Sequence, residues 1–186
     1  MNNQSIAERY LNGTEFWSIS DQINLFKDGE SIPFDQVKTV YLDAIRKDLD
    51  ADPVASVILD SMFPEDPIMQ LRQFLICNYS NMDDQPDITS DGKTHREFVN
   101  CSKRGSCPHE GKLCLNYIPA LYGNLSKREI EVIKLTADGY EDKQIAALLN
   151  IDYSTIESHM KNIRQKTGCP NKPSIVAFAF RKNIIW

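Results

Sequence analysis

The sequence contains no run that approaches the roughly 18 to 20 consecutive apolar residues needed to span a bilayer. Its N-terminus lacks the succession of basic, apolar and small residues that marks a secretory leader. It also contains no internal repeat and no low-complexity tract. We therefore expect a chain with no membrane association that works in the cytoplasm, where cysteines usually stay reduced.

Positive charge is scarce in the larger, N-terminal part of the chain. The 186 residues carry a net charge of -5, yet residues 1–120 contain 11 Lys and Arg against 19 Asp and Glu, whereas residues 121–186 contain 10 against 7. This asymmetry predicts an acidic domain over 1–120 and a modestly basic domain over 121–186. Any contact with nucleic acid is expected from the second domain.

Residues 1–120 are predicted to be mainly helical. Apolar residues recur at three- and four-residue spacing, with prolines near the starts of segments, and these patterns predict helices near 6–11, over 33–48 and over 53–62, and a helix or strand from Ile68 into Cys77. The stretch from Phe16 to Phe26 fits neither pattern. The expected fold class is mostly α: an N-terminal helical domain with a cysteine-rich loop, followed by a four-helix C-terminal domain.

Cysteine is also sparse, but the few cysteines cluster. Three of the five lie in CSKRGSCPHEGKLC, residues 101–114, which Gly105, Pro108 and Gly111 mark as a looped segment. Cys77 precedes them by about two dozen residues. Four thiolates form the usual closed shell of a structural zinc site, although the spacings here are wider than the two to four residues of common zinc fingers.

Three interpretations of these cysteines stay open. The first is a structural zinc ion bound by Cys77, Cys101, Cys107 and Cys114, with His95 or His109 as a substitute for Cys77. The second is an iron-sulfur cluster on the same residues, although their spacing matches no ferredoxin pattern. The third is a set of unligated thiols, in a core or as a redox-responsive pair. The expected reducing compartment and the turn-rich loop favour zinc.

An enzymatic zinc site lacks half of its motif. His95-Arg96-Glu97 fits the His-x-Glu half of the zinc deaminase signature, but the Pro-Cys-x-x-Cys half is missing. No third group is apparent that would orient a Cys-His nucleophile. We therefore expect no enzyme.

The C-terminal sixty residues are marked out as four short helices. Ser126-Lys-Arg-Glu129 is a capping box and predicts a helix that stops at Gly139. A second helix is predicted from Asp142, a third over Ser154–Thr167 with Gly168 as its left-handed cap, and a fourth from Pro173. The second and third have the spacing of a helix-turn-helix, whose second helix enters the major groove of DNA.

The outer face of the third predicted helix is polar and able to form hydrogen bonds. It presents Thr155, Glu157, Ser158, Lys161, Asn162 and Gln165, and nearby Lys143, Arg164, Lys166 and Lys172 could reach phosphates. The alternative is a small helical bundle that binds a protein such as RNA polymerase. Salt separates the two, because phosphate contacts make affinity fall steeply with salt concentration.

Leu125 to Ile185 resembles the LuxR-type (NarL/FixJ-like) helix-turn-helix domain over its whole length. It carries Leu-Ser-x-Arg-Glu, Lys-x-Ile-Ala, Thr-Ile-x-x-His-x-x-Asn-Ile-x-x-Lys and a following Gly. The resemblance implies that 154–167 is the recognition helix, that Glu157, Ser158 and Lys161 face base edges, and that the phosphates lie near Lys143, Thr155, Asn162 and Lys166. Glu157 stands where many members carry Lys, and Lys172 stands where Arg is usual.

The resemblance further implies a bacterial or phage-type transcription regulator that binds double-stranded DNA and can form a homodimer through the fourth helix. Residues 1–120 show neither the alternating strands and helices of a receiver domain nor the length of an acyl-homoserine-lactone pocket. Their cysteine segment, NCSKRGSCPHEGKLC, is similar to an unnamed cysteine-bearing segment that precedes LuxR-type domains in bacterial and prophage proteins. The prediction is a DNA-binding regulator with a structural zinc site in its N-terminal domain.

Overall fold

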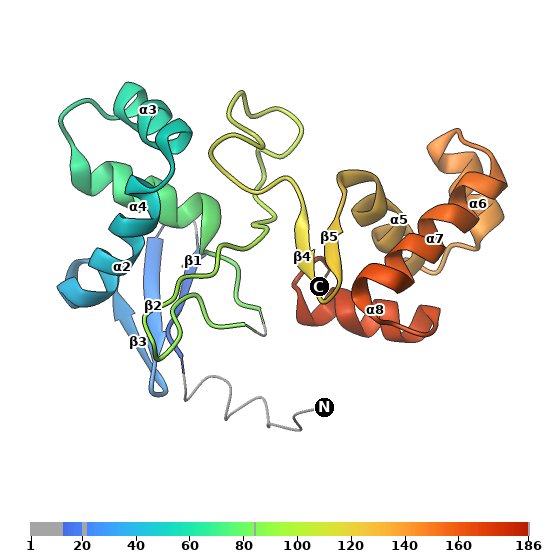
Figure 1. The fold of residues 1–186 in the computed structure, drawn as a ribbon, viewed down its shortest axis with the longest axis horizontal. Coiled ribbons are helices and arrows are strands. Elements are labelled where there is room, and N and C mark those ends of the chain that lie inside the picture. Colours follow the sequence, from blue (N-terminus) through green and yellow to red (C-terminus); the bar gives the residue numbers. More distant parts are fainter. Residues whose placement is uncertain (1–12, 20–21, 84, 186) are drawn as a thin grey trace. The chain divides into compact units, whose positions relative to one another are not determined.

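The computed structural model, drawn in Figure 1, describes residues 13–19, 22–83 and 85–185. The chain divides into two compact units, residues 1–115 and 116–186. The helix predicted near residues 6–11 lies outside the described residues. Within the described residues, no helix is both long enough and apolar enough to cross a bilayer.

The first unit opens with a three-stranded antiparallel sheet. Its strands are β1 (Glu15–Ile19), β2 (Gln22–Lys27) and β3 (Glu30–Pro33), and they lie in the order β1-β2-β3. Asp28 and Gly29 connect β2 to β3 with φ angles of 52° and 85°, so that Lys27 pairs with Glu30. Two central residues with positive φ form the turn that matches the twist of a hairpin, which explains glycine at the second position.

The prediction of a mainly helical N-terminal domain was therefore wrong. Phe16 on β1 and Ile23 and Leu25 on β2 are buried, and β2 buries alternate side chains against the core. Each strand has only four to six residues, too few for a two-residue period to stand out. Asp28-Gly29 was the available hairpin signal, but strand pairing itself depends on contacts between segments.

Three helices follow the sheet, after a short 3-10 turn at Phe34–Gln36. They are α2 (Thr39–Asp50), α3 (Pro53–Met62) and α4 (Pro67–Asn78). The carboxylates of Asp52 and Asp66 accept hydrogen bonds from the backbone N–H groups of Ala55 and Met69, and each caps a helix that begins with proline. The helix predicted over 53–62 is confirmed. The helix predicted over 33–48 begins later, at Thr39, and the segment from Ile68 to Cys77 is a helix rather than a strand.

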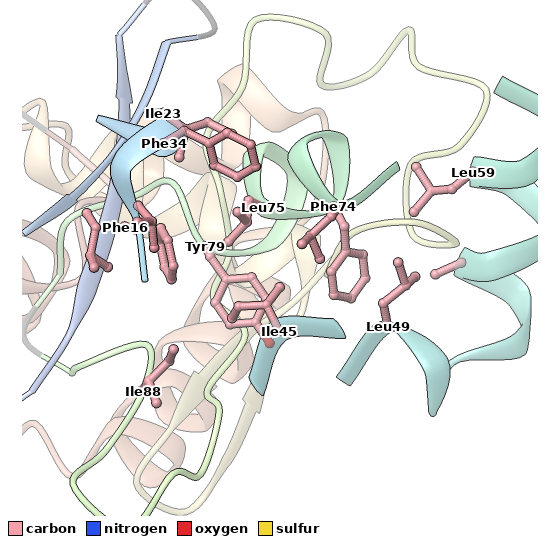
Figure 2. Packing of buried hydrophobic residues seen from close by; sticks show 14 of the residues in the cluster. Phe16, Ile23, Phe34, Ile45, Leu49, Leu59, Phe74, Leu75, Tyr79 and Ile88 are labelled. Atoms are coloured by element: carbon pink, nitrogen blue, oxygen red, sulfur yellow. The ribbon is translucent and has the colours of Figure 1, made fainter. Parts of the chain in front are cut away.

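Helix α4 packs against β1 and β2, and α2 and α3 pack against α4; Figure 1 shows α4 between the sheet and α3. Figure 2 shows the core between these elements, where Phe74 and Tyr79 lie between the sheet residues and Leu49. Arg96 closes this core from the loop, because its guanidinium lies 4.7 Å from the centre of the Phe74 ring and forms ion pairs with Asp48 and Asp52.

The second unit begins with a hairpin of β4 (Ile118–Ala120) and β5 (Gly123–Leu125). Four helices follow: α5 (Lys127–Ala137), α6 (Asp142–Leu149), α7 (Tyr153–Thr167) and α8 (Lys172–Arg181). The four predicted C-terminal helices are confirmed, including the capping box of Ser126 and Glu129 and the left-handed cap at Gly168, where φ is 72°. The hairpin was not predicted.

Candidate functional site

Helices α6 and α7 form a tight helix-turn-helix. Three residues, Asn150 to Asp152, separate them, and Asn150 adopts the left-handed conformation with φ of 51°. The N–H of Ile151 donates to the carbonyl oxygen of Ala146 at 3.0 Å, which closes the last turn of α6. The side chains of Ile156, Met160 and Ile163 are buried, and this stripe fixes which face of α7 points outward.

The opposite face of α7 is exposed and polar. Glu157, Ser158 and Lys161 lie on it at the spacing of one helix face, and the other exposed polar residues of the helix include Asn162, Arg164 and Gln165. Thr155 is half-buried. The hydroxyl of Ser158 donates to the carbonyl oxygen of Ser154 at 2.9 Å, so its lone pairs remain able to accept. The negative charge of Glu157 raises the pKa of the neighbouring Tyr153.

The predicted phosphate-binding lysines fall into two groups. Lys143 on α6 and Lys161 on α7 are exposed and form no ion pair with any described residue. Lys172, by contrast, lies 2.9 Å from a carboxylate oxygen of Asp142, and Lys166 lies 2.9 and 2.7 Å from the two carboxylate oxygens of Glu129. Lys166 and Lys172 therefore already hold elements of the unit together.

Glu129 is a buried anchor for α7. Its side chain is 3% exposed, and it accepts hydrogen bonds from Lys166 and from the backbone N–H and hydroxyl of Ser126. Burial opposes ionisation of this carboxyl group, but the bonds from Lys166 and Ser126 hold its pKa below the ordinary value. The ion pair joins the start of α5 to the end of α7.

The Leu-Ser-x-Arg-Glu segment builds the scaffold that presents α7. Leu125 is fully buried, and Ser126 is the N-cap of α5. The guanidinium of Arg128 donates to the carbonyl oxygen of Leu149 at 2.8 Å, which satisfies an orphan acceptor at the end of α6. With the ion pair of Glu129 and Lys166, this short segment contacts both helices of the helix-turn-helix.

The hairpin closes the C-terminal end of α7. The N–H of Tyr122 donates to the carbonyl oxygen of Lys166 at 2.8 Å. A Cβ atom at Gly168 would lie 3.3 Å from the ring of Tyr122 and 3.5 Å from the side chain of Leu121. This contact could not be predicted from the sequence, because each strand has only three residues, fewer than any periodic pattern requires.

Residues 123–179 match the family described as bacterial regulatory proteins of the luxR family. This segment is a luxR-family helix-turn-helix domain. The chain is also 41% identical over 61 residues to oxygen regulatory protein NreC from Staphylococcus aureus, with the same values for strains JH9 and JH1. These 61 residues are 33% of this chain and 28% of NreC, so the chain spans less than a third of the curated relatives that it matches.

The first unit, which precedes the luxR-family domain, brings four cysteines to one cavity. Cys77 lies in the last turn of α4, and Cys101, Cys107 and Cys114 lie in the loop; all four line a cavity of about 660 Å³. His109 lines it too, whereas His95 is not among the described residues that do. All five cysteines of the chain are free thiols, and Cys169 is buried in the luxR-family unit, where its thiol lies 3.4 Å from the carbonyl oxygen of Ser174.

The Cys77 thiol is the most strongly affected by its surroundings. Burial raises the pKa of the Cys77 thiol to about 11, and negative charge on Cys114, Cys101 and Cys107 contributes in the same direction. Within the described part of the chain, however, no three of these sulfur atoms lie within 4.8 Å of one another. The thiols are gathered but not drawn into a tetrahedron.

In the described part of the chain, one group of three potential metal-ligating side chains does have its ligand atoms within 4.8 Å of one another: Glu15, Asp83 and Glu97. Their recorded contacts are structural: Glu15 accepts from the backbone N–H groups of Asp83 and Asp87, and Glu97 accepts from that of Asn81. Asp87 is buried beside them and accepts from the N–H of Phe16 at 2.6 Å. Burial and the charges of Glu15 and Glu97 raise its pKa well above the ordinary value.

The His-x-Glu triplet that suggested a deaminase half-site lies in the same loop. The backbone N–H of His95 donates to the carbonyl oxygen of Asp87. Arg96 binds the carboxylates of Asp48 on α2 and of Asp52, and Glu97 belongs to the acidic group. Each of these contacts ties the loop to the body of the first unit.

Proposed function

We propose that the chain is a DNA-binding transcription regulator whose helix α7 reads base edges in the major groove. The observation that carries this proposal is the exposed polar face of α7, with Glu157, Ser158 and Lys161 on it, in a luxR-family domain. The match to NreC covers 61 residues, 28% of NreC, so the proposal concerns DNA binding and not the signal that is sensed.

The geometry of α7 suits a groove. Its 15 residues make a helix about 22 Å long, and a major groove about 12 Å wide admits one helix. Lys161 can donate to guanine oxygen and nitrogen acceptors, whereas Glu157 can accept from the amino group of cytosine. A carboxylate in this position also repels phosphates, so Glu157 favours sites where its hydrogen bond compensates.

Phosphate contacts are expected first from the exposed cations. Lys143 on α6 has an exposed side chain and no carboxylate partner among the described residues, so it can bind phosphate at no internal cost. Lys166 and Lys172 would each have to loosen an ion pair, with Glu129 and Asp142 respectively. Thr155 and Asn162 flank the base-facing residues and complete the proposed phosphate-binding set.

A pair of chains would read two half-sites. Helix α8 leaves Phe180 57% exposed, and large exposed aromatic side chains are common where one protein surface meets another. A dimer through α8 would present two recognition helices, and the half-sites would then be separated by about one helical turn of DNA or a multiple of it.

Selection from random duplexes, followed by salt titration on the selected site, tests the proposal. We expect enrichment of one sequence, and a log affinity that falls linearly with log salt concentration with a slope of about -0.9 for each phosphate contacted. Failure to enrich any sequence, with little dependence on salt, would instead favour the second candidate, a surface that binds RNA polymerase or another regulator.

A further inference from the structure

The loop from Cys101 to Leu115 has little apolar core of its own. Leu113 is the only buried apolar residue in this described stretch, and its backbone forms turns without any helix or strand. Gly105, with φ of 84°, and Gly111, with φ of 75°, let it reverse direction. A segment with so few buried groups needs another source of order, and disulfides or metals usually supply it.

A few polar contacts fix where the cysteines lie. The side-chain amide of Asn78 donates to the carbonyl oxygen of Leu113 at 3.0 Å, so Cys77 and Cys114, the neighbours of these two residues, are held in adjacent segments. At the other end of the loop, Arg104 donates to the carbonyl oxygen of Val99 at 2.8 Å and lies over the ring of Phe98. These anchors hold the cysteines around the cavity without a disulfide.

We propose that Cys77, Cys101, Cys107 and Cys114 bind one zinc ion as a closed structural site. Thiolates are soft ligands, and four of them satisfy zinc without leaving a position for chemistry. Such a centre carries a charge of -2, and the cavity is also lined by Arg72, Lys103 and Arg104, which can offset it. Arg104 is half-buried and lies 3.9 Å from a carboxylate oxygen of Glu110. Two of its guanidinium nitrogens are nevertheless buried without a hydrogen-bond acceptor among the described residues, which favours a further anionic neighbour.

Binding must draw the sulfur atoms together. Tetrahedral ligands at about 2.3 Å from zinc lie about 3.8 Å from one another, whereas no three of these four sulfur atoms are mutually within 4.8 Å in the described chain. Cys101 is exposed and belongs to the loop, so it can move inward with least disturbance to α4. Zinc is therefore expected to order the loop as it binds.

Metal analysis of the full chain, purified freshly under reducing conditions, is the first test. We expect one zinc ion per chain, and cobalt(II) substitution should give sulfur-to-metal charge-transfer absorption. Single Cys→Ser variants at 77, 101, 107 and 114 should each lower that absorption by about a quarter, because one thiolate of four is lost. Cys169→Ser is the matched control, since this thiol is buried in the other unit, and should leave it unchanged.

Thiol labelling of the unaltered chain covers the case in which a variant fails to fold. With zinc bound, the four cysteines should resist alkylation, and a chelator should expose all four, whereas Cys169 should react slowly in both states. The proposal would be overturned if the extent of cysteine alkylation were the same with and without the chelator, or if the chain took up neither zinc nor cobalt. So would iron with acid-labile sulfide, which would assign the cysteines to an iron-sulfur cluster.

His109 provides a test of the fourth ligand, because it lines the same cavity. We expect His109→Ala to keep full zinc content and full charge-transfer absorption. If His109→Ala loses zinc while Cys77→Ser keeps it, Cys77 is not a ligand and the four-cysteine site is wrong.

Discussion

The side-chain amide of Asn78, at the end of α4, donates at 3.0 Å to the carbonyl oxygen of Leu113, 35 residues later. The same amide nitrogen also donates to the carbonyl oxygen of Phe74 at 3.1 Å, and Asn78 is fully buried. The backbone carbonyl oxygen of Asn78 accepts a hydrogen bond from the backbone N–H of Glu97. One residue therefore joins α4 both to the segment just before the cysteine loop and to the end of that loop.

Asn78→Ala should destabilise the first unit and loosen the loop. The change removes both hydrogen bonds that the side-chain amide donates and leaves the carbonyl group of Leu113 without this donor. The loss costs about 1–3 kcal/mol in free energy of unfolding. Chemical denaturation measures this loss, and the rate of zinc transfer to a chelator should rise in the same variant. Gln36→Ala, an exposed amide in the same unit, is the control and should change neither quantity. An unchanged midpoint for Asn78→Ala would contradict the structural role.

Removal of metal should loosen the cysteine loop selectively. If zinc supplies the order that the sparse core of residues 101–115 does not, a chelator should speed amide hydrogen exchange there and at the end of α4. Helices α5 to α8 serve as the internal control and should exchange at unchanged rates. Equal exchange in the loop with and without chelator would show that the loop is ordered by protein contacts alone.

Lys161→Ala should weaken binding to the selected DNA site. Its exposed position on α7 allows a contact with a base edge, and loss of one such contact costs about 1–3 kcal/mol, or roughly 5- to 150-fold in affinity. Fluorescence anisotropy on the selected and a scrambled duplex measures both affinity and preference. Lys47→Ala removes an exposed positive charge from α2 in the other unit, and this variant should bind the DNA site normally. If both variants bind alike, Lys161 does not face the bases.

The ion pair of Glu129 and Lys166 should make the luxR-family domain sensitive to acid. The pKa of Glu129 is lowered in the folded protein, so its contribution to stability is complete above the ordinary carboxyl pKa and is lost as pH falls through the lower, folded value. Thermal unfolding of the wild type should therefore lose stability below about pH 4.5. Glu129→Gln should be less stable at pH 7 and should show a smaller loss on acidification. Parallel pH curves for the two proteins would contradict this account.

Gly168→Ala should destabilise the same domain more than Gly139→Ala does. Both glycines end helices with positive φ, 72° and 89°, so alanine costs backbone strain of about 1 kcal/mol at either position. Only Gly168 is also covered by Tyr122 and Leu121, whereas a Cβ at Gly139 meets nothing within 4 Å. The difference between the two free energies of unfolding isolates the packing of the hairpin on α7. Equal losses would show that this packing contributes little.

The four helices of the second unit were predictable because their signals are local. A capping box, a left-handed glycine cap and apolar residues at helical spacing each act within a few residues, so Ser126, Glu129 and Gly168 could be interpreted from the sequence alone. The same spacing placed Glu157 and Lys161 on the outer face of α7. The ion pairs of Lys166 and Lys172 could not be predicted in this way, because Glu129 and Asp142 lie on other helices.

The first unit depended on contacts between distant segments. Short strands are stabilised by pairing with neighbouring strands rather than by their own sequence. The sheet of residues 15–33 could therefore not be predicted from periodicity. The cysteines were visible in the sequence, but whether Cys77 belongs with the other three was not. The sequence by itself determined the helix-turn-helix and the presence of four thiols in the first unit. Only the tertiary structure brought Cys77 to the loop, because the hydrogen bond from Asn78 to Leu113 spans 35 residues that no local pattern connects.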